Sequence, residues 1–111
     1  MKPVFLFLAV MAILSFFRGA PTSAEFYAHE VNPKCDTILF TTEWCGACKK
    51  AIAYFEKKNY SYCEYNVESQ SPEVKYYHKL QTKSVPTILI GNQVSVGFNS
   101  REIDSLVKLL E

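Results

Sequence analysis

The chain has 111 residues, a length that suits one domain, and its 49% of hydrophobic residues are enough for a packed core. Lysine and arginine number 12 against 11 for aspartate and glutamate, and no basic run stands out. This balance gives no electrostatic case for binding nucleic acid, so nucleic-acid partners are not expected.

Residues 1–24 have the pattern of a secretory signal peptide. Lys2 supplies a positive charge, residues 4–17 are almost wholly apolar, and Thr22-Ser23-Ala24 offers small residues for a cleavage site before Glu25. The apolar run is shorter than the roughly 18–20 residues that a membrane span needs. An uncleaved signal anchor is the alternative. In either case we expect an exported protein, in a periplasm, an endoplasmic reticulum lumen or the extracellular space, without membrane contact once the signal is cleaved.

Residues 25–35 are interpreted as a polar, irregular leader that contains Pro33, and residues 36–111 as the folded domain. In chain order, the patterns predict a strand at 36–41, a helix at 47–58, a strand at 60–67, a helix starting at 71–73, strands at 87–90 and 93–96, and a last helix capped by Ser100. A helix between the first two strands implies a right-handed crossover and parallel pairing. The Gly91-Asn92 turn predicts a hairpin between the last two strands. The expected fold class is therefore α/β, with one mixed four-stranded sheet in the order β-α-β-α-β-β-α, flanked by helices.

Cys45-Gly46-Ala47-Cys48 lies where the first predicted strand passes into the first predicted helix. A helix N-terminus presents unpaired N–H groups and a partial positive charge, so a thiolate there is stabilised and its pKa falls below the free value of about 8.5. Cys45, just before the helix, is the expected exposed nucleophile. Cys48, one turn on, is the expected buried resolving thiol. Gly46 permits a tight turn, Ala47 leaves access to the sulfur, and both are assigned to substrate binding with the preceding Trp44.

Three other interpretations of this cysteine pair stay open: half a zinc site, a structural disulfide, or thiolate binding of an iron–sulfur cluster or copper by a non-enzymatic module. Cys35 and Cys63 are isolated, and the chain has no second CxxC and no HxxxH partner, which disfavours zinc. A purely structural disulfide would not explain the position at a strand–helix junction or the preceding Trp44. No metal site is therefore predicted.

Residues 37–111 resemble a glutaredoxin, with TILFTTEWCGACKKAIAYFEKK and then SVPTILIGNQVSVGF at the spacing of that family. The stretch Trp44-Cys45-Gly46, followed by Cys48 and Lys49, is closer to the active site of thioredoxins. The resemblance covers nearly all of the chain after the signal segment. It implies a thioredoxin/glutaredoxin fold and thiol–disulfide exchange in which Cys45 attacks and Cys48 resolves.

The resemblance also implies a substrate-binding role for residues outside the cysteine motif. On composition alone, Pro86 is only a turn residue before a strand. By resemblance, the Val85–Pro86 bond is cis and packs beside the cysteine pair, and the backbone of Val85 pairs with bound peptide or glutathione. Gly97 and Phe98 are then expected to line the same groove.

Several positions depart from the patterns of both families. Thr42 stands where many glutaredoxins have a lysine that holds a glutathione carboxylate. The glutaredoxin Gly-Gly pair before the last helix is reduced to Val96-Gly97, and the acidic residue that follows is replaced by Asn99-Ser100. Leu39 stands where thioredoxins have a buried aspartate. The accessory groups of neither family are complete, and the usual glutathione contacts are weakened.

Cys35 and Cys63 are the remaining cysteines. Cys35 precedes the first predicted strand and Cys63 lies early in the second. If the two strands are parallel neighbours, about 5 Å apart, both cysteines fall at the sheet end away from Cys45, within reach of a disulfide. We hypothesise a structural Cys35–Cys63 bridge, and the alternative is two separate thiols.

The sequence thus predicts a dithiol–disulfide oxidoreductase that acts on protein disulfides or glutathione mixed disulfides. No cofactor is expected, glutathione being a candidate co-substrate, and a redox partner protein and a monomeric state are expected. The competing class is a non-enzymatic thioredoxin-fold module whose thiolates hold a metal or cluster.

Overall fold

The computed structural model describes residues 22–111. The predicted signal segment up to residue 21 lies outside the described residues, and so does the choice between a cleaved signal and an anchor. Within residues 22–111, none of the helices has the length and apolar character needed to cross a membrane. The strands are β1 (Thr22–Ser23), β2 (Thr37–Thr41), β3 (Cys63–Asn66), β4 (Thr87–Ile90) and β5 (Gln93–Val96), and the helices are α2 (Ala28–Val31), α3 (Gly46–Lys58), α4 (Val74–Leu80) and α5 (Ser100–Leu109).

The strands form one mixed sheet in the order β1-β5-β4-β2-β3. β2 and β3 are parallel, with Ile38 opposite Cys63 and Thr41 opposite Asn66. β4 runs antiparallel to both β2 and β5. The predicted parallel pair, the hairpin and the mixed sheet are therefore confirmed. The sheet gains one strand beyond the four predicted, because Thr22 and Ser23 pair antiparallel with the outer edge of β5.

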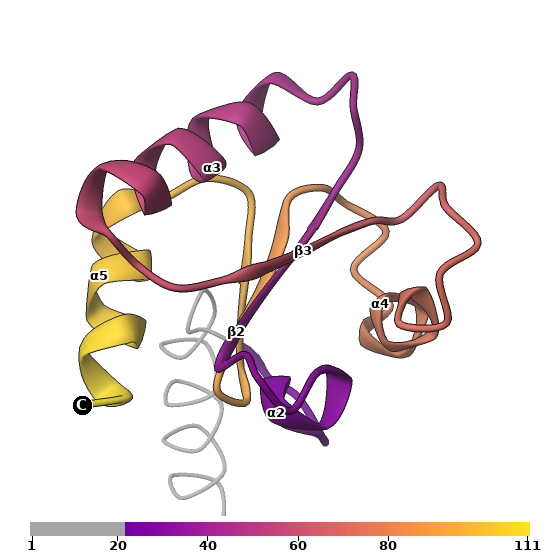
Figure 1. Cartoon of the computed structure of the whole chain (residues 1–111), viewed down its shortest axis with the longest axis horizontal. Coiled ribbons are helices and arrows are strands. Elements are labelled where there is room, and N and C mark those ends of the chain that lie inside the picture. Colours follow the sequence, from indigo (N-terminus) through magenta and orange to yellow (C-terminus); the bar gives the residue numbers. More distant parts are fainter. Residues whose placement is uncertain (1–21) are drawn as a thin grey trace, which may run out of the picture.

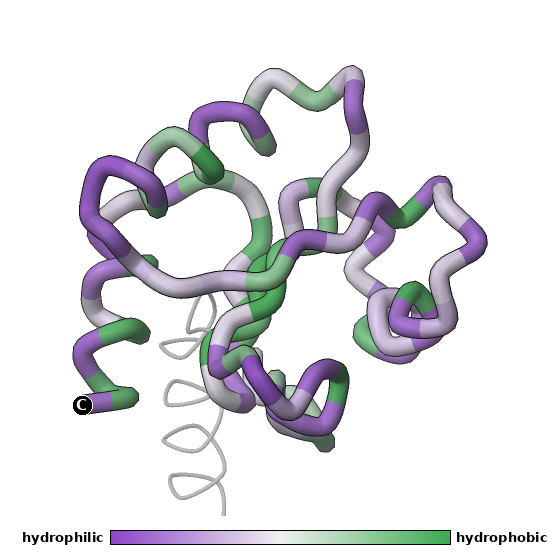
Figure 2. The backbone as a smooth tube through the Cα atoms, in the orientation of Figure 1, coloured by the Kyte–Doolittle hydropathy of each residue, from purple (hydrophilic) through white to green (hydrophobic). Residues whose placement is uncertain are grey.

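Helices cover both faces of the sheet, with α3 and α5 on one side and α2 and α4 on the other (Figure 1). Side chains of a strand alternate between these faces. Leu39 and Ile88 pack against the α3 and α5 side with Phe55, while Ile38 and Phe40 pack with Ala28 of α2 on the other side. The most hydrophobic backbone accordingly runs through the central strands (Figure 2).

The predicted irregular leader is wrong in one respect, because its residues contain helix α2. Ala28 and Val31 are buried in the core, and the Ala28 N–H donates to the Gly91 carbonyl over 2.8 Å. The ring of Phe26, in the same leader, lies 5.0 Å from that of Tyr76 on α4. A helix of one turn gives too few apolar residues for a periodic pattern, so only its packing reveals it.

One of two predicted helix ends differs in detail from the structure. The N-cap of α5 is Asn99, whose side-chain oxygen accepts from the Glu102 N–H over 3.1 Å, and Ser100 is the first helical residue. Asparagine and serine are comparable N-caps, so the sequence could not separate neighbours. The C-terminus of α3 is as predicted, with Asn59 in the left-handed conformation at φ 56°.

Candidate active site

The Cys45–Cys48 pair lies at the start of α3, on the loop that leaves β2. Cys45 is the N-cap residue in extended conformation, and its Sγ accepts a hydrogen bond from the Cys48 N–H over 3.1 Å. The two cysteines are joined as a disulfide, with Cα atoms 5.2 Å apart. A cysteine sulfur thus takes the place that a serine or aspartate oxygen usually has at a helix N-cap. An N–H group and the helix dipole therefore act on the sulfur of Cys45.

The two sulfurs differ little in exposure. Cys45 is 6% exposed and Cys48 is 1% exposed. The predicted exposed position of Cys45 is therefore wrong for this disulfide form, although Cys45 remains the more accessible of the two. Its sulfur is directed inward, toward Cys48 and to within 3.7 Å of the Val85 carbonyl oxygen. The neighbouring Gly46 is exposed, and a Cβ added there would meet nothing within 4 Å.

The loop before β4 brings Val85 and Pro86 beside the disulfide. The peptide bond between them is cis, the isomer that the resemblance implies. Pro86 is fully buried and Val85 is half-buried. The Gly97 N–H donates to the Pro86 carbonyl over 2.8 Å, and the Thr87 hydroxyl donates to the Ser84 carbonyl over 2.7 Å. These bonds fix the loop, so the Val85 backbone has a defined position next to Cys45.

The other predicted substrate-binding residues divide into two groups. Gly97 adopts φ 82° and joins the Val85–Pro86 loop through its N–H. Phe98 is half-buried and packs edge-on against Tyr54, with ring centroids 5.7 Å apart, beside the core under α3 and α5. Trp44 is 71% exposed, and Ala47 is half-buried. The structure therefore brings the Cys45–Cys48 pair together with Val85, Pro86 and Gly97, whereas the ring of Phe98 packs against Tyr54 of α3.

Acidic residues beside the disulfide were missed by the sequence analysis. The Trp44 indole N–H donates to a carboxylate oxygen of Glu68 over 3.0 Å. The Thr41 hydroxyl donates to Glu64 over 2.7 Å. Glu64 and Glu68 lie near the site because β2 and β3 are parallel, and this pairing places the end of β3 beside the loop that carries Cys45. The sequence predicts this pairing, but no local pattern indicates that it brings two carboxylates near Cys45.

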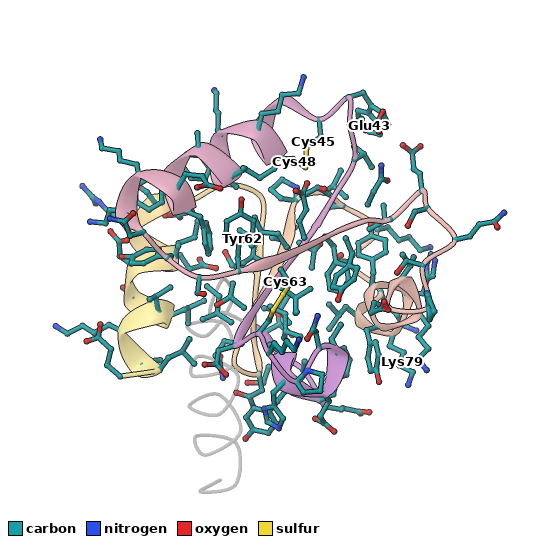
Figure 3. All side chains as sticks on the ribbon, viewed as in Figure 1. Glu43, Cys45, Cys48, Tyr62, Cys63 and Lys79 are labelled. Carbon is teal, nitrogen blue, oxygen red and sulfur yellow. A yellow bond between two sulfur atoms is a disulfide. The ribbon has the colours of Figure 1, made fainter. Side chains whose placement is uncertain are left out.

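Cys35 and Cys63 are joined in a second disulfide, with Cα atoms 6.0 Å apart. Figure 3 shows this bridge at Cys63, well below the labelled Cys45 and Cys48. It ties the segment before β2 to the first residue of β3, at the end of these strands away from α3.

The described residues present neither a free thiol nor a metal-binding cluster. All four cysteines are paired in the two disulfides. Across residues 22–111, histidine, cysteine, aspartate and glutamate side chains do not gather in groups of three or more that could hold a metal ion. In this structure the Cys45–Cys48 pair is a disulfide at a helix N-terminus.

Comparison with known proteins identifies the family of this chain. The sequence pattern of the glutaredoxin family matches residues 37–95. This chain belongs to the glutaredoxin family. It is 35% identical over 71 residues to a protein of Clostridium pasteurianum described as an uncharacterized glutaredoxin-like 8.6 kDa protein in the rubredoxin operon, and the match covers 63% of this chain and 95% of that protein.

Solved structures of glutaredoxins share the fold. Glutaredoxin grx-1 from Archaeoglobus fulgidus has a TM-score of 0.60 at 13% identity, over 76% of this chain and 98% of its own. Buckwheat glutaredoxin, solved as a glutathione complex, has a TM-score of 0.58 at 19% identity, over 75% of this chain and 83% of its own. The glutaredoxin-like NrdH-redoxin from Escherichia coli, described as having a thioredoxin-like activity profile, has a TM-score of 0.55 at 21% identity, over 63% of this chain and 92% of its own. The thioredoxin/glutaredoxin fold predicted from sequence is confirmed.

Proposed function

We propose that this glutaredoxin-family protein is a dithiol oxidoreductase that works through Cys45 and Cys48. The family and the fold support thiol–disulfide oxidoreductase activity in general. The observation that carries the assignment of roles is the hydrogen bond from the Cys48 N–H to the Cys45 sulfur at the start of α3. It supports Cys45 as the attacking thiol, because a negative charge on this sulfur would be stabilised by the N–H group and the helix dipole. Cys48 is almost fully buried, in the place of a resolving thiol.

In the reducing direction, the Cys45 thiolate attacks one sulfur of a substrate disulfide. A mixed disulfide forms, and the other substrate sulfur leaves as a thiolate that takes up a proton. Cys48 then loses its proton and attacks the Cys45 sulfur, which releases the second substrate thiol. The substrate gains two electrons, and the protein is left with its Cys45–Cys48 disulfide. In the oxidising direction the same steps run in reverse.

A substrate polypeptide would bind along the Val85–Pro86 loop. The Val85 carbonyl oxygen lies 3.7 Å from the Cys45 sulfur, and Val85 is half-buried rather than covered. An extended peptide that carries the reacting sulfur could pair with this backbone and place its own sulfur in line with Cys45. Gly97, which joins this loop, presents backbone without a side chain, and a Cβ there would meet nothing within 4 Å.

The reaction requires no bound cofactor. Protein disulfides or glutathione mixed disulfides are the proposed substrates. Either glutathione or a partner dithiol protein would regenerate the reduced form, in which Cys45 and Cys48 each carry a thiol. We propose that the protein acts as a monomer outside the cytosol, in a periplasm, an endoplasmic reticulum lumen or the extracellular space. Such compartments allow the Cys35–Cys63 disulfide to persist.

The experiment is turnover of two substrates, a glutathione mixed disulfide and the disulfides of insulin, with Cys45→Ser as the control. We expect activity on at least one substrate, and its loss in the variant. Activity on the glutathione substrate would define a glutathione-dependent enzyme, and activity on insulin alone would define a protein-disulfide enzyme. Failure on both would contradict the proposal and favour a module that binds a metal or a partner without turnover.

A further inference from the structure

The outer edge of β5 is the place where this sheet accepts an added strand. The two-residue strand β1 occupies part of that edge, with Thr22 opposite Val94, and both of its residues are exposed. The Ala24 N–H, just after β1, donates to the Asn92 carbonyl over 2.7 Å. The predicted signal cleavage after Ala24 would remove this strand, and it would leave the edge of β5 without the partner that it has here.

The pairing of β1 determines which backbone groups of β5 point outward. In an antiparallel ladder the hydrogen-bonded pairs recur at every second residue. Because Ala24 bonds to Asn92, the next outward positions along β5 are Val94 and Val96. β1 begins at Thr22, opposite Val94, so within residues 22–111 no strand lies opposite Val96 on this side. Its N–H and carbonyl are therefore directed to the open end of the edge.

A cleft of about 770 Å³ lies beside this edge, on the face of the sheet that α2 and α4 cover. Its apolar lining comes from β5, from the end of α4 and from the leader, and includes Val94, Val96, Leu80 and Phe26. The side chain of Val96 is 50% exposed. Alternate side chains of an added strand would enter the cleft, since alternate residues of a strand point to the same face. The lining favours apolar, β-branched side chains at those positions.

The open end of the edge leads to the loop that is proposed to bind substrate. Val96 precedes Gly97, whose N–H donates to the Pro86 carbonyl over 2.8 Å. Thr82, in the wall of the cleft, shares a 2.7 Å hydrogen bond with the Thr87 hydroxyl, just after the same loop. An added strand would lie two strand spacings, about 10 Å, from β4. About four extended residues are enough to connect it to a sulfur bound beside that loop.

We propose that, once residues 1–24 are removed, the outer edge of β5 binds an extended segment of the polypeptide whose disulfide reacts at Cys45. The segment pairs antiparallel with β5, in the place and direction of β1, and presents alternate apolar side chains to the cleft. The inference rests on the proposed function and on the predicted cleavage, and it specifies the substrate class. In a chain that retains Thr22–Ala24, β1 competes with the substrate for the same edge.

The direction of pairing predicts the order of residues in the substrate. β5 runs toward Gly97 and the substrate-binding loop, so a segment antiparallel to it runs away from the loop. The reacting cysteine therefore lies on the N-terminal side of the paired segment. A substrate with the two parts in the opposite order could not use the edge in this way.

The experiment measures second-order rate constants for single-turnover reduction by two reduced chains, one that starts at Thr22 and one that starts at Glu25. The first disulfide peptide carries Val-Thr-Val about four residues C-terminal to the reacting cysteine, and the control peptide carries it at the same distance on the N-terminal side. Hydroxyethyl disulfide reports the chemistry at Cys45 alone. Urea unfolding verifies that both chains are folded.

Two single substitutions test the edge without a change of length. Ala24→Pro in the longer chain removes the N–H that donates to Asn92, which weakens the docking of β1. Val96→Pro in the shorter chain removes the outward N–H at the open end, a position where an edge strand tolerates proline.

We expect the shorter chain to reduce the first peptide about fivefold faster than the longer chain. This ratio corresponds to about 1 kcal/mol, the net contribution of one hydrogen bond. Ala24→Pro should increase the rate constant of the longer chain, and Val96→Pro should return the shorter chain to the lower value. The two chains should reduce the control peptide and hydroxyethyl disulfide equally.

Equal rate constants of the two chains for the first peptide, with activity still abolished by Cys45→Ser, would overturn the inference and leave the proposed function standing. An equal gain with the control peptide would overturn it as well. So would a dimer of the shorter chain in size-exclusion chromatography, because a second copy would then occupy the edge. Reduction of no disulfide by either chain would mean that the proposed function itself has failed.

Discussion

The Cys48 N–H and the Cys45 sulfur are joined by a 3.1 Å hydrogen bond at the first turn of α3. The residue that is expected to resolve the mixed disulfide therefore also supports the sulfur that forms it. Because N–H···S bonds at a helix start favour the anionic sulfur, the two cysteines are made chemically unequal by one turn of helix. Their Cα atoms remain 5.2 Å apart, close enough for the second attack.

This inequality predicts that the reduced protein alkylates first at Cys45. At pH 6 to 7, iodoacetamide should modify Cys45 about tenfold faster than Cys48, because only Cys45 combines access with a stabilised thiolate. Peptide mapping of a brief, limiting reaction measures the ratio. Cys48→Ser should leave the rapid phase in place, and Cys45→Ser should remove it. Equal labelling of the two cysteines would contradict the assignment of roles.

The Cys35–Cys63 disulfide predicts a loss of stability without a loss of chemistry. It closes a loop with a sequence separation of 28 residues. In the chain-entropy model, a loop of this length stabilises the folded state by about 3 kcal/mol. Cys35→Ser/Cys63→Ser should therefore lower the free energy of unfolding by about that amount in urea titration, while disulfide turnover at Cys45 continues. Free alkylation of Cys35 and Cys63 in the native oxidised protein would show that the bridge does not form in solution.

A cluster of two tyrosines on one aspartate predicts pH-dependent stability. Tyr54 and Tyr60 donate to the two carboxylate oxygens of Asp104 over 2.6 and 2.7 Å. These hydrogen bonds hold the pKa of Asp104 below its ordinary value of 3.8, and the same bond raises the pKa of Tyr54 from 10.0 to about 12. The stabilisation of the folded state by these hydrogen bonds should be complete between pH 4 and pH 10. This stabilisation should be lost below pH 4, as acid protonates Asp104. It should also be lost as the pH rises from 10 toward 12, as Tyr54 loses its proton.

Urea unfolding of Asp104→Asn across pH 3 to 7 tests this cluster. The variant should be less stable than the wild type at pH 7, and the difference should narrow as the pH falls below 4, because only the wild type then loses its carboxylate. Asp36→Asn, which changes an exposed aspartate, is the control. A difference that stays constant with pH would assign the effect to packing and not to charge.

The edge strand β1 predicts that removal of residues 22–24 lowers the stability of the domain. Thr22 and Ser23 pair with β5, so cleavage after Ala24 would remove a strand that the fold uses. The Ala24 N–H also donates to the Asn92 carbonyl over 2.7 Å. A chain that starts at Glu25 should be less stable than one that starts at Thr22 by about 1 kcal/mol, the net value of a typical intramolecular hydrogen bond. Thermal unfolding of the two forms measures the difference, and equal stability would show that β1 is dispensable.

The elements of the domain were predictable because each has a local pattern. The runs at Thr37–Thr41 and Thr87–Ile90 are apolar and β-branched, and Gly91-Asn92 forms the turn of the hairpin. The pairings that involve the leader were not predictable. β1 is two residues long and α2 is one turn, so both form only because β5 and the core offer partners, and no period in the sequence records them.

The cysteine motif of the candidate site was predictable from the sequence, but the surface around it was not. The position of Cys45 at the start of a helix follows from the strand–helix junction, and the place of Pro86 follows from the resemblance. The low exposure of Cys45 depends on the direction of its sulfur, which the sequence does not encode locally. Glu64 and Glu68 lie about 20 positions downstream of Cys45 and come near the site only through strand pairing.

The most direct test of the account is to trap the mixed disulfide in Cys48→Ser. Without a resolving thiol, the reaction should stop after the first attack. Mass spectrometry should find one substrate thiol bound to Cys45 in a one-to-one adduct that dithiothreitol releases. Cys45→Ser, treated in the same way, should form no such adduct. An adduct at another cysteine, or the absence of an adduct at Cys45 while the substrate is still reduced, would contradict the central claim that Cys45 is the nucleophile.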